Sequence, residues 1–247
     1  MSLSLRTTFN FLGGAPANPQ LELVVGNSSF SPNNGGSCCL WTVPANTRYI
    51  RFEMWGGGGG GAGACCCQQG CGGSGGSYAV RTLTGAQVVA GCQYTICAAG
   101  STTATAQCCG INGNNSFVTG NNLSNFCARG GCTGTTSCFW TGNRHTMMCY
   151  FQCCAAGGDI NIHATQSTHR TNNYCYNGMI QMTTVAPATV SGPIYGPAGC
   201  SVAGCGDCFI LAAPIFPGGG GHSAITHGGS FRSGWWGAPG LVLVTFG

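Results

Sequence analysis

The sequence predicts an all-β fold: a glycine-rich, β-sandwich-like domain, rich in cysteine, with long loops and polyproline-II-like segments. Three observations favour this class. Short runs of alternating apolar and polar residues are separated by glycine, asparagine, serine and threonine, which is typical of strands joined by loops. No stretch has a convincing helical period, and glycine or proline interrupts most candidates, so we expect helix in under about a tenth of the chain. Finally, 45 of the 247 residues are glycine and 20 are cysteine.

The strand candidates divide the chain into two parts. Residues 1–37 carry the run LELVV and the turn cluster SPNNGG, and we interpret them as an N-terminal anchoring or docking segment. Residues 38–247 are the glycine-rich β domain. Its strand candidates, in order, are RYIRFEMW, SYAVRTLT, CQYTICAAG, NSFVTG, GDINIHA and GLVLVTF. The first and last bracket the domain and are expected to lie in one sheet.

The run RYIRFEMW has the clearest two-residue alternation. Because successive side chains of a strand point to opposite faces, Ile50, Phe52 and Met54 are expected on one face. The other face is expected to carry Tyr49, Arg51, Glu53 and Trp55.

Six consecutive glycines follow Trp55, and three consecutive cysteines come soon after them. Glycine costs roughly 0.5–1 kcal/mol of folding free energy relative to alanine, so something must offset the excess. We expect the glycines to let backbones pack against one another in extended or polyproline-II-like segments, where no side chain fits. The cysteines then fix that arrangement.

Disulfides are the favoured interpretation of the cysteines, and buried thiols acting as small apolar side chains are the alternative. The doublets such as Cys38–Cys39 favour distant partners, and a doublet on a strand can join two layers at once. Metal binding is a further alternative. Its weak candidates are Cys205 and Cys208 of the sequence CGDC, and our interpretation assigns no metal.

Two glycine motifs resemble catalytic or nucleotide sites but lack the context for them. Gly56, Gly58 and Gly61 match G-x-G-x-x-G, yet no helix pattern follows, and the next acidic residue is Asp159. Ser74 matches G-x-S-x-G without a strand-to-helix turn. With four acidic residues in all, we predict no enzyme activity and no cofactor.

Charge and hydropathy restrict the partners. The net charge of +4 comes from scattered arginines, with no lysine, so no basic cluster predicts nucleic-acid binding. No run of 18 apolar residues predicts a membrane span, and the N-terminus has no secretory signal pattern. Dense cysteine normally indicates an oxidising compartment. A protein made in a host cytoplasm and used outside it, as virion components are, reconciles these observations.

The order of the motifs resembles a known family. The segments VPANTRYIRFEMWGGGGGGAGA, GGSGGSYAVRTLT, VVAGCQYTICAAG, NNSFVTGNNLSNFCARGG, AAGGDINIHA and GAPGLVLVTFG resemble the glycine-rich domain of bacteriophage tail fibres and related virion structural proteins, over about residues 40–247. The chain departs from that family by placing cysteine where members commonly have glycine, alanine or serine.

The resemblance implies a virion protein, a tail fibre, tail tip or other external appendage involved in host contact. A capsid decoration or fibre protein is a variant, and a cysteine-rich metal-binding or redox protein is the alternative from another class. The expected partners are other copies of the chain, with a homotrimer favoured, other virion proteins through the N-terminal segment, and a host surface glycan or protein.

Two aromatic and arginine-containing segments are candidates for host contact, because such side chains supply most contact energy at interfaces. Packing in the core or in a subunit interface is the alternative for both. The candidate residues are Phe139, Trp140, Arg144, His145 and Tyr150 in the first segment and Phe231, Arg232, Trp235 and Trp236 in the second.

Overall fold

The computed structural model describes the backbone and side chains of residues 36–63, 72–103, 110–134, 154–163, 214, 216–221 and 233–247. It also describes the backbone of short strands at 7–9, 20–25, 68–70, 136–138, 146–148, 168–170, 174–176, 179–181, 202–203 and 209–210. These residues form strands and extended segments, with a single 3-10 turn, η1 (Gly85–Gln87). Among them, no helix is long and apolar enough to cross a membrane. The prediction of an all-β fold is confirmed for this part of the chain.

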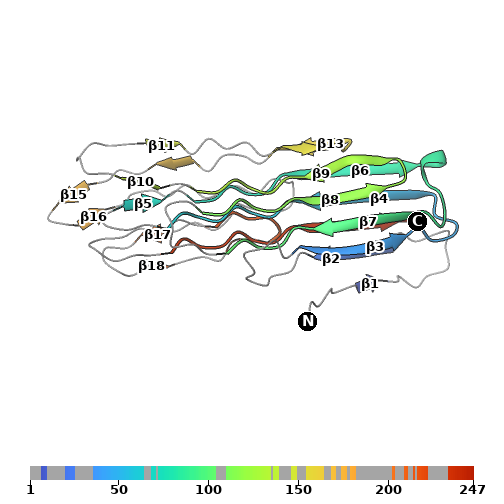
Figure 1. Cartoon of the computed structure of the whole chain (residues 1–247), viewed down its shortest axis with the longest axis horizontal. Helices are drawn as coiled ribbons and strands as arrows, with labels where there is room; N and C mark the ends of the chain where they lie inside the picture. Colours follow the sequence, from blue (N-terminus) through green and yellow to red (C-terminus); the bar gives the residue numbers. More distant parts are fainter. Residues whose placement is uncertain are drawn as a thin grey trace.

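Two antiparallel sheets make up the main body (Figure 1). The six-stranded sheet consists, in spatial order, of β1 (Thr7–Phe9), β2 (Gln20–Val25), β19 (Leu241–Phe246), β4 (Tyr49–Trp55), β6 (Tyr78–Thr84) and β13 (Ile160–Ile162). The five-stranded sheet consists of β12 (Ala155–Ala156), β9 (Leu123–Ala128), β8 (Ser116–Gly120), β7 (Gln93–Ala98) and β3 (Ser37–Thr42).

Four further pairs of short antiparallel strands are described by their backbone. They are β5 (Gln68–Gly70) with β10 (Thr136–Cys138), β11 (Thr146–Met148) with β14 (Thr168–Arg170), β15 (Tyr174–Tyr176) with β16 (Met179–Gln181), and β17 (Val202–Ala203) with β18 (Phe209–Ile210).

Strand pairing follows the sequence pattern. β4 pairs with β19 from Trp55 opposite Leu241 to Ile50 opposite Phe246, so the predicted pairing of RYIRFEMW with GLVLVTF is confirmed. β2 pairs with the other edge of β19. The run LELVV of the N-terminal segment is therefore part of the six-stranded sheet, whereas the docking role of residues 1–37 stays a prediction.

The two sheets pack face to face around an aromatic core. Ile50, Phe52 and Met54 are fully buried in it, as their alternation predicts. The ring of Phe52 lies 5.3 Å from that of Tyr94 and 6.1 Å from that of Trp41, both in the five-stranded sheet. Aromatic pairs at such separations add about 0.5–1.5 kcal/mol each beyond their area burial. These contacts across the layers make the structure a β-sandwich.

The disulfide in the described part of the chain joins Cys38 of β3 to Cys97 of β7. The two residues are direct cross-strand partners with Cα atoms 4.1 Å apart. Cys39, the next residue, packs against the core from the opposite face of the strand. The doublet therefore does place its side chains on two faces, but the bond of Cys38 stays within one sheet, because Cys97 lies directly opposite it.

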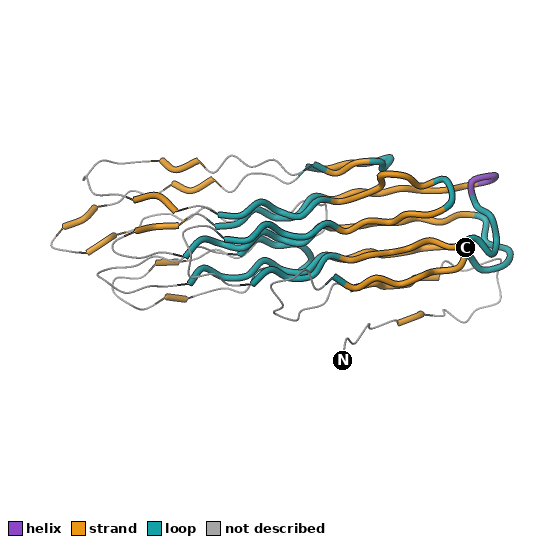
Figure 2. The backbone as a smooth tube through the Cα atoms, viewed as in Figure 1, coloured by secondary structure: helices purple, strands orange, loops and turns teal. Residues whose placement is uncertain are grey.

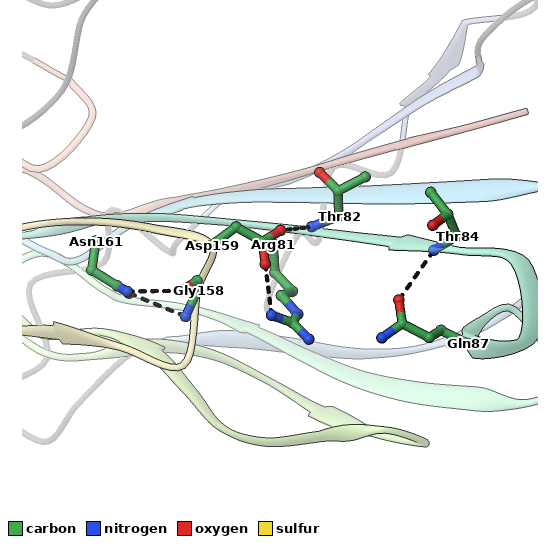
Figure 3. Close-up of polar contacts among 7 residues, drawn as sticks. All are labelled: Arg81, Thr82, Thr84, Gln87, Gly158, Asp159 and Asn161. Carbon is green, nitrogen blue, oxygen red and sulfur yellow. Dashed lines mark hydrogen bonds and ion pairs between the residues drawn. The ribbon is translucent and has the colours of Figure 1, made fainter.

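The short segment 155–162 joins the edges of the two sheets, because β12 pairs with β9 and β13 pairs with β6. Asp159 in its turn accepts hydrogen bonds from the Arg81 guanidinium at 2.6 Å and from the Thr82 N–H at 2.7 Å (Figure 3). Asn161 closes the turn with two hydrogen bonds to the backbone of Gly158. The segment 155–162 is thereby fixed to β6.

Candidate functional site

Beyond one end of the sandwich, the strands continue as extended chains that contain few side chains (Figure 2). We call these the glycine bundle, which comprises residues 56–63, 72–77, 99–103, 110–115, 129–134, 217–221 and 233–240. In Figure 2 they are the teal segments that prolong the orange strands away from η1 and the C-terminus. The bundle is the candidate functional element, because most of the unusual composition of the described chain lies in it.

Residues 56–61 form the central chain of the bundle, and their hydrogen bonds repeat every three residues. The N–H groups of Gly56 and Gly59 donate to the carbonyls of Ser77 and Ser74 in the chain 72–77. Those of Gly57 and Gly60 donate to Asn114 and Ile111 in the chain 110–115. Those of Gly58 and Gly61 donate to Ala238 and Trp235 in the chain 233–240, and all six bonds are 2.8–3.0 Å long. A polyproline-II helix has three residues per turn and no internal hydrogen bonds. The hydrogen bonds of the central chain, which go to three different neighbours in rotation, are typical of this conformation.

Three more chains complete the surroundings of the central chain. Its carbonyls accept hydrogen bonds from Gly131 and Gly134 of the chain 129–134 and from Gly221 of the chain 217–221. The chain 99–103 lies against Gly57 and Gly60. Thus six chains enclose a seventh. The sequence predicts that backbones pack against one another in polyproline-II-like segments, and the bundle has this kind of packing.

Glycine is required wherever a chain faces another backbone. A Cβ atom on any of Gly56, Gly58 or Gly59 would lie less than 3.0 Å from the carbonyl carbon and oxygen of a neighbouring chain. The same holds for glycines three residues apart in three outer chains, Gly73 with Gly76, Gly110 with Gly113 and Gly234 with Gly237, which face the central chain. At these positions a Cα–H group points at a carbonyl oxygen, a contact that contributes about 0.5–1 kcal/mol.

The bundle keeps the strand register of the sandwich but adds bonds between its layers. β4 and β6 pair up to Trp55 opposite Tyr78, and the pairing continues as Gly56 N–H to Ser77 and Gly59 N–H to Ser74. In addition, Gly57 bonds to Asn114, although the strands that these two chains continue belong to different sheets. The two sheets merge into one hydrogen-bonded bundle as soon as the side chains between them end.

A few hydroxyl groups satisfy backbone groups that the merging leaves over. The Ser116 hydroxyl, fully buried at the junction, accepts a hydrogen bond from Ala99 N–H at 3.0 Å and donates to the Trp55 carbonyl at 2.6 Å. Further into the bundle, the hydroxyl of Thr102 accepts the N–H of Gly237 at 2.7 Å. These groups join the extensions of opposite sheets.

Tyr78 marks the same junction on the outer face of the six-stranded sheet. It packs with Trp55, Val80 and Leu241 in a second apolar cluster, and its hydroxyl donates to Glu53 at 2.8 Å. Burial, followed by the hydrogen bond and charge of Glu53, raises the pKa of Tyr78 well above its ordinary value. Trp55 thus lies on the face that its alternation predicts, yet it is only 1% exposed.

The structure places two of the predicted contact residues in the bundle. The rings of Trp235 and Trp236 are stacked with centroids 4.3 Å apart, and both residues are half-buried. The other candidates lie outside the described residues, in the connections between 134 and 154 and between 221 and 233. These are Phe139, Trp140, Arg144, His145, Tyr150, Phe231 and Arg232.

The motifs considered for nucleotide binding and hydrolysis are part of the bundle. Gly56, Gly58 and Gly61 are buried within it. Ser74 is 3% exposed, and its hydroxyl accepts the N–H of Cys132 at 2.8 Å. Both motifs therefore take part in packing the backbone.

Metal binding receives no new candidate from the described residues. Within the described ranges, no three His, Cys, Asp or Glu side chains are grouped to hold a metal ion. Cys205 and Cys208 lie outside those ranges, and their candidacy stays a hypothesis.

A comparison with protein families identifies one match that spans most of the chain. The family model described as a glycine-rich domain covers residues 32–247. The search of curated proteins found no match.

Proposed function

The chain belongs to the family of glycine-rich domains, and from this premise we propose that it is a bacteriophage virion structural protein. Its place would be a tail fibre, tail tip or other external appendage that contacts the host. It would be made in the host cytoplasm and assembled, as a homo-oligomer with a trimer favoured, onto other virion proteins through its N-terminal segment. The order of sequence motifs supports the appendage over other virion locations.

The observation that carries this proposal is the enclosed central chain of the bundle. Backbone hydrogen bonds in three directions make the bundle a rigid extension of the sandwich. The described chains run out from the sandwich and back in pairs: 56–63 with 72–77, 99–103 with 110–115, and 217–221 with 233–240. A rigid scaffold of paired chains that projects from a sandwich suits recognition of a surface.

The first test of the proposal is location. An antibody against this chain, viewed by electron microscopy on intact particles, is expected to label an external appendage. Labelling confined to the particle interior, or no association with particles, would contradict the proposal.

The second test concerns host contact. Particles that carry Trp140→Ala and Trp235→Ala are expected to adsorb to cells less efficiently, with Val89→Ala as a control at the exposed turn near the opposite end of the sandwich. Unchanged adsorption with intact assembly would remove both segments from the receptor site. Failed assembly would instead support the packing role of these aromatic residues.

The third test is the oligomeric state. The mass of the purified chain in solution, measured by light scattering, is expected to be that of a trimer. A stable, soluble monomer at working concentration would contradict the proposed assembly.

A further inference from the structure

Two asparagines on the outside of the glycine bundle have their amide groups fixed in one orientation. Asn112 accepts the N–H of Thr133 through Oδ1 at 2.8 Å, and Asn115 accepts the N–H of Gly130 through Oδ1 at 3.0 Å. An N–H donor bonds only to the oxygen of a carboxamide, so the NH₂ groups face elsewhere. Both residues are exposed, and among the described residues none accepts a hydrogen bond from these NH₂ groups.

The spacing of the two asparagines follows from the geometry of the chain. They are three residues apart, which is one turn of a polyproline-II-like chain and a rise of about 9 Å. Gly110 and Gly113, in the same chain, face the central chain. The NH₂ groups therefore form a row along the outer surface.

The residue before Gly130, whose N–H bonds to Asn115, is an arginine, Arg129. In the neighbouring chain, a Cβ on Gly130 would meet Gly113 and one on Gly131 would meet Ser74, so the three-residue period directs Arg129 away from both. Arg129 is exposed and takes part in neither ion pair of the described residues, Arg51–Glu53 and Arg81–Asp159. We call Asn112, Asn115 and Arg129 the donor strip.

The donor strip presents hydrogen-bond donors and positive charge without an acidic neighbour. No described residue of the bundle is Asp or Glu. Hydrogen bonds to a charged acceptor are stronger than those between neutral groups. A row of such donors is complementary to a polymer with carboxylates at regular intervals.

We propose that the donor strip binds an acidic, carboxylate-bearing polysaccharide of a cell surface, with the amides of Asn112 and Asn115 and the guanidinium of Arg129 donating to its carboxylates. The choice of a cell-surface polymer rests on the proposed function. The binding site itself rests on the fixed amides.

The test is calorimetric titration of the full chain with a polygalacturonate oligosaccharide, and with neutral dextran for comparison. The unaltered chain is expected to bind polygalacturonate at least about tenfold more tightly than dextran, and more weakly as salt is raised. The double variant Asn112→Asp with Asn115→Asp keeps both Oδ1 acceptors but replaces the donors by negative charge. It is expected to lose at least about tenfold in affinity, with an unchanged melting temperature.

Asn114→Asp is the matched control, because it makes the same change in charge in the same chain. Asn114 directs its side chain differently, since its neighbour Gly113 faces the central chain and Asn115 faces the chain 129–134. Its affinity is expected to fall by less than about threefold. An equal loss in the control and in the double variant would overturn the proposal, as would the absence of polygalacturonate binding by the unaltered chain.

The two proposals fail in different ways. If the unaltered chain does not bind polygalacturonate but the Trp140 and Trp235 variants still reduce adsorption, the donor strip is refuted and host contact stands. If the chain is absent from the particle exterior but the titration behaves as expected, the virion assignment is refuted and the binding site stands.

Discussion

In the sandwich, β4 and β8 belong to different sheets, and only their side chains meet. In the glycine bundle, the chains that extend these two strands are joined directly by backbone hydrogen bonds, such as that from Gly57 to Asn114. Facing sheets are typically about 10 Å apart, whereas hydrogen-bonded neighbours are about 4.8 Å apart. The registers of the strand pairs continue across the change. What differs is the volume of the side chains between the layers.

The comparison teaches that two kinds of core stabilise one chain. The sandwich is held by buried apolar side chains around Phe52, and the bundle by backbone hydrogen bonds between chains that lack side chains on their contacting faces. Removal of volume should therefore damage the sandwich, and addition of volume should damage the bundle.

The largest effect is expected in the sandwich, from Phe52→Ala. Phe52 is fully buried and contacts aromatic rings of the opposite sheet, so the cavity should lower the free energy of unfolding by about 3–5 kcal/mol. Urea denaturation measures this. Phe52→Leu, which keeps most of the volume, should cost clearly less, and equal costs would argue against a packed core at this position.

The opposite substitution is expected to damage the bundle. In Gly58→Ala, the new Cβ would overlap the backbone of Gly219, which cannot rotate away, so the free energy of unfolding should fall by about 3 kcal/mol. Gly91→Ala is the control, because its Cβ meets nothing within 4 Å and only the backbone angle φ of +80° is unfavourable. It should cost about 1–2 kcal/mol. A smaller loss at Gly58 than at Gly91 would contradict the enclosed position of the central chain.

A moderate effect is expected where the two regions meet. Ser116→Ala leaves the N–H of Ala99 and the carbonyl of Trp55 without their hydroxyl partner, which should cost about 1–3 kcal/mol. Ser124→Ala, at an exposed position of β9, should change stability by less than about 0.5 kcal/mol. Similar thermal unfolding of the two variants would show that the junction does not depend on this hydroxyl.

The smallest effect is confined to alkaline pH. Because the folded state raises the pKa of Tyr78, the unfolded chain releases this proton first, above about pH 10. The contribution of Tyr78 is therefore fully present below that pH and is lost as the pH rises towards the folded-state pKa. Tyr78→Phe should reduce the alkaline loss of stability only in part, since burial also raises the pKa of Tyr94. An unchanged alkaline profile would contradict the shift at Tyr78.

Alternation predicted most strands of the sandwich, but no strand candidate covered β1, β3, β9 or β12. The runs that become β4, β6, β7, β8, β13 and β19 are visible in the sequence, and the inward face of β4 is confirmed at Ile50, Phe52 and Met54. The partner of Cys38 was not predictable, because it depends on which strand lies beside β3. The register between β3 and β7, and not the spacing of cysteines along the chain, determines which cysteine pairs with Cys38.

The sequence could predict that glycine-rich backbones pack against one another, but not which chains are neighbours in the bundle. A glycine has no side chain to mark which neighbour it faces, so the order of chains around residues 56–61 appears only in the structure. One signal was present: glycines three residues apart, such as Gly110 with Gly113 and Gly234 with Gly237. That spacing is found in outer chains with one face against backbone, while the run of six glycines forms the chain enclosed on all sides. The donor strip had no such signal, because the orientation of Asn112 and Asn115 follows from hydrogen bonds across chains.

Amide hydrogen exchange of the central chain, resolved by residue in a glycine-labelled sample, tests the account most directly. Gly56 to Gly61 have no strand partners in the usual sense, but each N–H is bonded to another chain. Their amides are predicted to be protected to the same degree as those of β4, and the amide of Gly85, at the exposed turn η1, to exchange rapidly. Exchange of Gly56 to Gly61 as fast as that of Gly85 would contradict the hydrogen-bonded bundle.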